Sequence, residues 1–129
     1  MITLHSKLNE HDIKMITQNG LIHFTEENSI QGIIKDGLTG NVSKMSKLES
    51  MYGKIVWFYI YDPQENQKHL ELIKTKHNKS NYNCGIVLEK FGEYEFEKMR
   101  IRKGFGRDMA VIYKTDRIRG HNMRTWFPK

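Results

Sequence analysis

The stretch Ile55-Val-Trp-Phe-Tyr-Ile-Tyr61 gives the strongest strand signal in the chain, and Asp62-Pro63 closes it. Its residues are apolar or aromatic at both odd and even positions. A strand that is apolar on both faces usually lies inside a sheet whose two faces are covered. We therefore expect residues 55–61 to form a central strand, around which the other elements are arranged.

The chain before this strand predicts two helices around one short strand. Residues 6–18 have helical spacing, and Ser6 is placed to cap their first turn. Residues 21–25 favour a strand. Thr25 is then placed to cap a second helix, whose apolar residues recur three and four positions apart until Gly37 stops it.

The remaining segments predict a loop, a helix and a set of strands. Residues 39–54 are polar and glycine-bounded, which indicates a loop, and residues 65–78 read as a surface helix. Three strand candidates follow, at residues 84–91, 93–101 and 109–113. Helices and strands in this order do not alternate as in a wound parallel sheet. The expected fold class is α+β, with a mostly antiparallel sheet and two to three helices.

Length and composition narrow the class of protein. The chain has 129 residues, of which 38% are hydrophobic and 28% charged, so a single domain over residues 1–129 is expected. No apolar run approaches the roughly 20 residues that a membrane-spanning helix needs. The single Cys84 excludes an internal disulfide and a cysteine-rich zinc site, and the histidines lack metal-ligand spacing. We expect a cytoplasmic protein with no membrane partner and no metal.

Positive charge is concentrated at the end of the chain. Residues 98–129 hold 10 Lys and Arg against two Asp, whereas the first 97 residues hold 11 against 13 acidic residues. All six arginines lie in this last quarter. The planar guanidinium matches phosphate, so the skew favours a nucleic-acid partner. The expected contacts are Arg100, Arg102, Arg117, Arg119 and Arg124. A basic but merely solvated pair of strands is the alternative.

A short motif near the N-terminus resembles a known family. Residues Leu21-Ile-His-Phe-Thr25, the following helix with Asn28 and Ile34, and Gly37-Leu38 look like the opening of ADP-ribosyltransferase-like domains. Within that superfamily they resemble the His-Phe-Thr group, which includes the DarT-type enzymes that modify DNA bases and, more distantly, the KptA-type RNA 2′-phosphotransferases. The run Lys54-Ile-Val-Trp-Phe58 occupies the place of a hydrophobic strand that such sequences often carry. The resemblance covers about residues 20–61 and implies a small split sheet.

The same resemblance implies a site for NAD as co-substrate. His23 would contact the NAD ribose, Thr25 with Phe24 would frame the nicotinamide, and Tyr52 or Tyr59 would stack on its ring. From the residues alone, a packed strand histidine is the better explanation of His23, because lone histidines on strands are more often merely packed. Trp57 and Phe58 are typical core residues.

Transfer from NAD also requires a carboxylate, because positive charge develops on the ribose. The family has a Glu on a late strand, and here Asp108 stands before the apolar run 109–113. The competing candidates are Glu93, Glu95 and Glu97, which alternation would place on one strand face, and we take Glu97 with Asp108 as the catalytic candidates. Where many members have a phosphate-binding arginine, this chain has Lys44 and Lys47.

These observations predict a small NAD-dependent ADP-ribosyltransferase-like protein that modifies nucleic acid or another macromolecule. A second hypothesis is a basic ribonuclease toxin, with His23 or His121 as acid–base group. A third is a non-catalytic module, such as an inhibitor that binds a nucleic-acid-associated partner. A cognate antidote or target protein is compatible with each of them.

Overall fold

The fold is built on one antiparallel sheet that contains β5 (Lys54–Ile60) near its centre. The computed structural model describes residues 5–42, 53–76, 78–103, 109–119 and 121–129. Every strand pairing among them is antiparallel. The strand order is β1 (His5–Lys7), β7 (Met99–Lys103), β8 (Met109–Lys114), β5, β2 (Leu21–Thr25), β6 (Cys84–Leu88) and β10 (Met123–Trp126).

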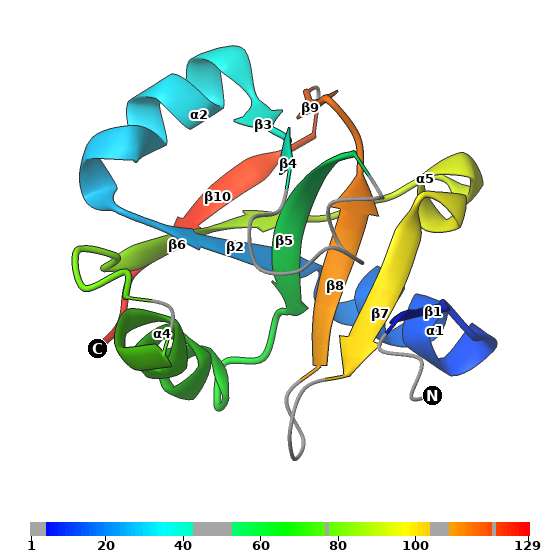
Figure 1. The fold of residues 1–129 in the computed structure, drawn as a ribbon, viewed down its shortest axis with the longest axis horizontal. Helices are drawn as coiled ribbons and strands as arrows, with labels where there is room; N and C mark the ends of the chain where they lie inside the picture. The colour runs from blue at the N-terminus through cyan, green and yellow to red at the C-terminus, as the bar shows by residue number, and fades with distance from the viewer. Residues whose placement is uncertain (1–4, 43–52, 77, 104–108, 120) are drawn as a thin grey trace.

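Two short strand pairs extend this arrangement. Strand β4 (Asn41–Val42) pairs with the beginning of β5, and β3 (Leu38–Thr39) pairs with β9 (Arg117–Ile118) as a separate two-stranded sheet. In Figure 1, β3 and β9 lie beside the end of α2 (Ile30–Asp36), so they close the fold over one end of the main sheet.

The main sheet divides where β2 meets β5. These two strands pair only through Leu21 with Ile60 and Ile22 with Tyr59, whereas β2 stays paired with β6 as far as Thr25. Beyond that point β5 continues along β8. Figure 1 shows the result, in which β2 and β6 run across the direction of β5, β8 and β7. The sheet is therefore split into two halves joined at one corner.

Helices cover both faces of the sheet. They are α1 (Glu10–Asn19), α2 with a preceding 3-10 turn η1 (Glu27–Ser29), α4 (Asn66–Lys76) and the short α5 (Glu93–Glu97). Asn9 caps α1, because its side chain accepts from Asp12 N at 2.8 Å while Asp12 accepts from Asn9 N at 3.0 Å. None of the described helices has the length and apolarity that crossing a bilayer would require.

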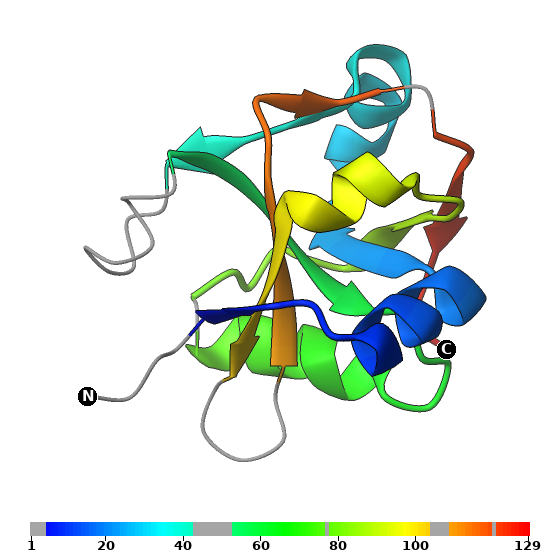
Figure 2. The same cartoon turned by 90° about the vertical axis from the view of Figure 1, so that its right-hand side faces the viewer.

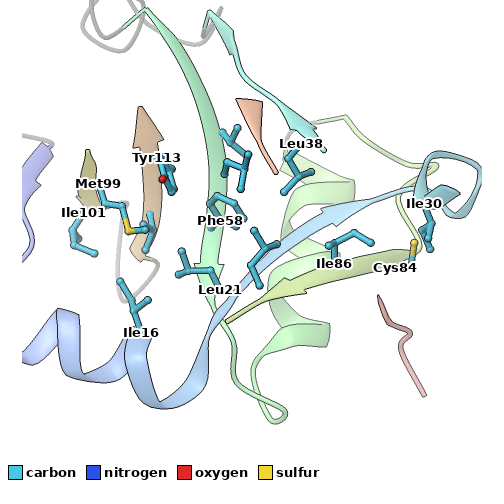
Figure 3. Packing of buried hydrophobic residues seen from close by; sticks show 14 residues of the cluster. Ile16, Leu21, Ile30, Leu38, Phe58, Cys84, Ile86, Met99, Ile101 and Tyr113 are labelled. Carbon is cyan, nitrogen blue, oxygen red and sulfur yellow. The ribbon is translucent and has the colours of Figure 1, made fainter. Parts of the chain in front are cut away.

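Two buried clusters hold these layers together. The larger contains Leu21, Val56, Phe58, Ile86, Met99 and Val111 with their neighbours, and Figure 3 shows it between the two halves of the sheet. The smaller joins Ile22, Phe24 and Val87 to Leu70 of α4. Because side chains alternate along a strand, neighbouring residues of β2 contribute to opposite clusters. The two faces of β2 therefore have different neighbours, and Figure 2 shows α2 above this strand and α4 below it.

The structure confirms the α+β class, the mostly antiparallel sheet and the internal position of residues 55–61. The expected two to three helices were too few, because the described residues form four α-helices and α5 was predicted as part of a strand. The structure also confirms strands at residues 21–25 and 109–113, and the strand predicted at residues 84–91 is present as β6 but ends at Leu88. The surface helix is α4, as expected.

Three predictions about element boundaries were wrong. Ser6 lies in β1, and the first helix begins only after Asn9, whose side chain provides the better cap. The second helix does not begin at Thr25, which remains in β2; a 3-10 turn intervenes and α2 begins at Ile30. The predicted strand 93–101 is instead helix α5 followed by β7, because the Glu95 carboxylate turns back to accept from Gly92 N at 2.7 Å.

Candidate functional site

A pocket of about 580 Å³ lies where the sheet splits. Its walls come from β2, α2, β3 and β9, and the polar side chains that line it include His23, Thr25, Asp36 and Arg117. Two of the predicted cofactor residues, His23 and Thr25, are therefore brought together, because they occupy alternate positions on the same face of β2.

The His23 ring is fixed by a contact across the split. Its Nδ1 lies 2.8 Å from the main-chain oxygen of Trp57. Because a carbonyl only accepts, Nδ1 donates the proton, and in the neutral ring Nε2 is then an acceptor. Burial lowers the pKa of His23, which outweighs the opposite effect of the hydrogen bond to Trp57. The residue is therefore a neutral imidazole at pH 7, with one nitrogen held and the other an acceptor.

The main chain of Phe24 faces the same split. Thr25 O accepts from Asn83 N on the β6 side, and Gly20 O accepts from Tyr61 N on the β5 side. Since main-chain groups of a strand point alternately to its two neighbours, the N–H and C=O of Phe24 point toward β5. The β2–β5 pairing ends at Ile22, and the Trp57 carbonyl that would face Phe24 N–H is bonded to His23 instead. A donor and an acceptor are thus presented side by side at the split.

The side chains of Phe24 and Tyr59 lie away from this pocket. Phe24 is buried in the smaller cluster, with ring centroids 5.8 Å from Trp126 and 5.9 Å from Tyr59. Tyr59 stacks on His69 of α4, at 4.3 Å between ring centroids. The structure therefore does not bring these two aromatic rings to His23. Tyr52, the other predicted stacking residue, lies outside the described residues, as do Lys44 and Lys47.

Of the two predicted carboxylates, the structure describes only Glu97. Glu97 is exposed at the end of α5 and does not line the pocket, and Asp108 lies outside the described residues. Among the residues that the structure describes, Asp36 is the acidic residue that lines the pocket. Our sequence reasoning missed it, although it directly precedes the Gly37-Leu38 pair used for the resemblance. The sequence feature that could have indicated Asp36 is its position as the last residue of the helix α2, which lines the pocket together with the strand of His23.

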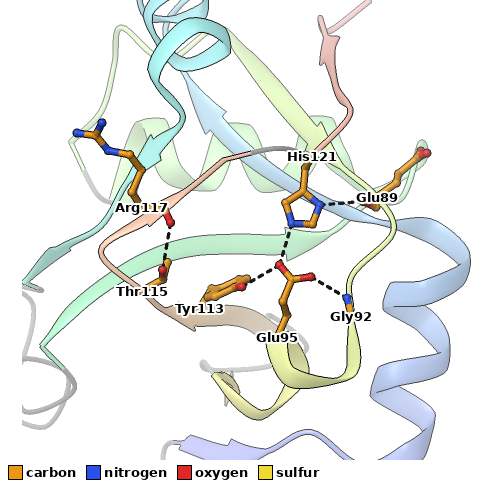
Figure 4. Close-up of polar contacts among 7 residues, drawn as sticks. All are labelled: Glu89, Gly92, Glu95, Tyr113, Thr115, Arg117 and His121. Atoms are coloured by element: carbon orange, nitrogen blue, oxygen red, sulfur yellow. Dashed lines mark hydrogen bonds and ion pairs between the residues drawn. The ribbon is translucent and has the colours of Figure 1, made fainter.

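A second polar cluster connects α5, β8 and the C-terminal segment, and Figure 4 shows it. Glu95 Oε1 lies 2.8 Å from His121 Nε2 and accepts from Tyr113 OH at 2.9 Å. His121 Nδ1 lies 3.1 Å from Glu89 O, so both ring nitrogens are held by contacts within the protein. Because neither nitrogen is left for a substrate, the geometry does not favour His121 as a catalytic acid–base group.

The Glu95 cluster also shifts the pKa of its members. Burial of the Glu95 carboxyl raises its pKa, but hydrogen bonds from Gly92, His121 and Tyr113 outweigh burial, so the net pKa is lowered. Burial and the bond to Glu95 raise the pKa of Tyr113 above its ordinary range. The sequence had placed Glu93, Glu95 and Glu97 on one strand face; in α5 only Glu95 is buried. No local sequence pattern indicated that Glu95 contacts His121, 26 residues away.

The predicted phosphate-binding arginines do not form one surface. Arg100 and Arg102 lie on β7, Arg117 lines the pocket with His23, and Arg119 lines an adjoining pocket of about 360 Å³. Arg124 lies on β10, where its Nε is 3.2 Å from Glu89 Oε1 and its guanidinium lies 4.7 Å from the Tyr61 ring centroid. The strand order separates β7 from β10 by four strands. The arginines therefore serve different parts of the molecule.

Neither a metal centre nor a relative identifies the site. Among the residues that the structure describes, no group of three or more His, Cys, Asp or Glu is positioned to hold a metal ion. No family model, curated protein or solved structure matches this chain. The geometry of the pocket and the sequence resemblance are therefore what point to a function.

Proposed function

We propose that this protein binds NAD in the pocket at the split of the sheet and transfers its ADP-ribosyl group to a macromolecule. The observation that carries the proposal is the separation of β2 from β5 directly after Ile22. It leaves the Phe24 main chain facing the gap, next to an imidazole that is already fixed by Trp57. A planar carboxamide needs one donor and one acceptor side by side, and Phe24 presents both.

His23 is suited to the neighbouring ribose. With Nδ1 donating to Trp57 O, the neutral ring directs an acceptor nitrogen to a ligand, and a ribose hydroxyl is a matching donor. The lowered pKa of His23 keeps this nitrogen unprotonated at pH 7. The resemblance of the His23-Phe24-Thr25 motif to ADP-ribosyltransferase-like domains supports the same assignment.

Asp36 is the carboxylate that we assign to the transfer step. The bond between the ribose and nicotinamide breaks, nicotinamide leaves with the bonding electrons, and a nucleophile of the acceptor forms the new bond and loses its proton. Positive charge develops on the ribose during this step, and a carboxylate that lines the pocket stabilises it. Asp36 is exposed at the end of α2, so it is accessible to a bound ligand.

Calorimetric titration of NAD into the wild-type chain and into His23→Ala tests the binding step. We expect the wild type to bind and His23→Ala to lose binding while its circular dichroism and thermal unfolding stay native. His11→Ala is the matched control, because His11 is an exposed histidine on α1 that does not line the pocket. Equal binding by His23→Ala, or no binding by the wild type, would contradict the proposal.

Asp36→Asn separates binding from transfer. We expect this variant to bind NAD and to lose the release of nicotinamide, whereas Glu97→Gln retains it because Glu97 is outside the pocket. If Glu97→Gln loses release and Asp36→Asn does not, the assignment of the carboxylate is wrong. A stable complex with a protein partner and no NAD binding would favour the non-catalytic module.

A further inference from the structure

The half of the sheet formed by β1, β7, β8 and β5 has an unusual charge composition. Figure 1 shows these four strands side by side. None of their residues is Asp or Glu, whereas their basic residues are Lys7, Lys54, Arg100, Arg102, Lys103 and Lys114. Opposite charges are interspersed on an ordinary protein surface, so a region of one sign points to an acidic partner.

Side-chain alternation places most of this charge on one face. Met99 and Ile101 of β7 are buried in the larger cluster, so Arg100 and Arg102 point to the opposite face. Lys7 of β1 is the cross-strand partner of Arg100 and shares that face. On β8, buried Val111 and Tyr113 similarly direct Lys114 outward.

An aromatic ring lies among these cations. Val56 and Phe58 belong to the larger cluster, so Trp57 is directed to the basic side, where its ring is partly exposed. The Arg102 guanidinium lies 5.7 Å from the ring centroid. Trp57 pairs across the strands with Ile112, which in turn pairs with Arg100, so tryptophan and arginine flank one buried aliphatic residue. We call Lys7, Trp57, Arg100, Arg102 and Lys114 the basic face.

We propose that the basic face binds single-stranded nucleic acid. Arginine forks match phosphate oxygens, and a partly exposed tryptophan provides a stacking platform that unpaired bases use without sequence preference. The Arg100 side chain donates through Nη1 to Glu97 O and Met99 O, which fixes the guanidinium. Within the part of the chain that the structure describes, its Nε and Nη2 make no hydrogen bond, so they can donate to a phosphate. An acidic peptide would match the charge but would gain nothing from the tryptophan.

This surface is separate from the NAD pocket. Val56 and Phe58 lie on the His23 side of β5, and Trp57 lies on the other side. A strand bound to the basic face therefore leaves the pocket open, and the surface recruits nucleic acid whether or not NAD is bound. The proposal does not depend on the proposed transferase activity.

The test is the salt dependence of binding to a fluorescently labelled, mixed-sequence single-stranded oligonucleotide. We expect Arg100→Gln/Arg102→Gln to weaken binding roughly 10-fold or more at low salt and to reduce the slope of log affinity against log salt by about 1.4, because each lost phosphate contact removes about 0.7. Lys68→Gln/Lys76→Gln on α4 is the matched control, since it removes the same charge from exposed positions elsewhere. Equal losses in the two double variants would show a nonspecific effect of net charge and would overturn the proposal.

Tryptophan fluorescence locates the bound strand. The chain has two tryptophans, so Trp126→Phe leaves Trp57 as the reporter and Trp57→Phe leaves Trp126, which packs on Phe24. We expect the oligonucleotide to quench the fluorescence of Trp126→Phe, in which Trp57 is the reporter, and not that of Trp57→Phe. Quenching of Trp126 alone would place the strand elsewhere. Competition by polyglutamate as strong as that by unlabelled oligonucleotide would assign the basic face to an acidic protein instead, and either result would overturn the proposal.

Discussion

Glu95 and His121 are 26 residues apart in the sequence, yet their side chains meet with 2.8 Å between Oε1 and Nε2. Both side chains are at least nine-tenths buried. The contact ties the segment between β9 and β10 to helix α5, and Tyr113 of β8 joins it through the same carboxylate oxygen. His121 follows β9, whose Arg117 lines the pocket with His23, and His121 itself lines the adjoining pocket of about 360 Å³.

Removal of the Glu95 charge is expected to destabilise the protein. Glu95→Gln removes the buried carboxylate that contacts His121 Nε2 and Tyr113 OH, and loss of one partner of a buried polar pair of this kind typically costs 3–5 kcal/mol; because Gln retains the shape, we expect about 3 kcal/mol. Urea unfolding at pH 7 measures this change. Glu93→Gln is the control, because Glu93 is exposed in the same helix. A loss of less than about 1 kcal/mol would show that the pair contributes little.

The same carboxyl predicts acid sensitivity. The folded-state pKa of Glu95 is lowered, so its contribution to stability is complete above the ordinary value of 4.5 and is lost as pH falls through the folded-state pKa. The free energy of unfolding of the wild type should therefore exceed that of Glu95→Gln at pH 5, and this difference should decrease as pH falls below 4.5. A difference that grows on acidification would contradict the assigned direction.

Tyr113 should respond at alkaline pH. Its folded-state pKa is raised, so its contribution is complete below the ordinary tyrosine value of 10 and declines as pH rises above it. Tyr113→Phe removes the bond to Glu95, and we expect a loss of about 1–2 kcal/mol at pH 7. In thermal unfolding, the variant should also show a weaker decline in stability between pH 9 and 11. Tyr94→Phe is the control, because Tyr94 is exposed on α5.

Local sequence signals predicted the elements that have strong apolar patterns. They failed where contacts between distant residues determine whether a segment forms a helix or a strand. The seven apolar or aromatic residues of 55–61 can be buried on both faces only inside a sheet. Similar apolar runs predicted β2 and β8. Residues 93–97 have the period of a strand. They form a helix because Glu95 bonds to Gly92 N nearby and to His121 far away. The contact with His121 cannot be predicted from a local sequence pattern.

The candidate site was predictable only in part for the same reason. His23 and Thr25 belong to one short motif on one strand face, so sequence alone placed them together. Asp36 and Arg117 are far apart in the sequence and line the same pocket because β3 pairs with β9, with Thr39 opposite Arg117. Phe24 and Tyr59 were assigned to the ligand from the motif, whereas alternation directs their rings to the cluster under α4.

Two glycines at the pocket provide a matched pair for stability. Gly37 has φ of 91°, and a Cβ there would lie 2.3 Å from Ile118 O, so Gly37→Ala should destabilise the protein by about 2 kcal/mol or more. Gly32 lies in α2, and a Cβ there would have no atom within 4 Å; Gly32→Ala should stabilise by about 0.5–1 kcal/mol. Urea unfolding of the two variants should therefore give changes of opposite sign. A neutral Gly37→Ala would mean that the turn between α2 and β3 adapts.

NAD binding should depend on the protonation of His23 with a definite sign. Burial lowers its pKa below the ordinary 6.5, so the neutral ring persists at pH 6.5 and above, and we expect constant NAD affinity from pH 6.5 to 8. As pH falls through the folded-state pKa, Nε2 gains a proton, ceases to accept from the ribose, and affinity should decline. Calorimetry from pH 8 to below 6.5 measures this decline in NAD affinity, and the same titration of Asp36→Asn separates the contribution of the Asp36 carboxylate.

Nitrogen NMR should show the proton of the His23 ring on Nδ1, as its bond to Trp57 O requires. A proton on Nε2 at pH 7, or affinity that rises on acidification, would show that His23 does not accept from the ligand.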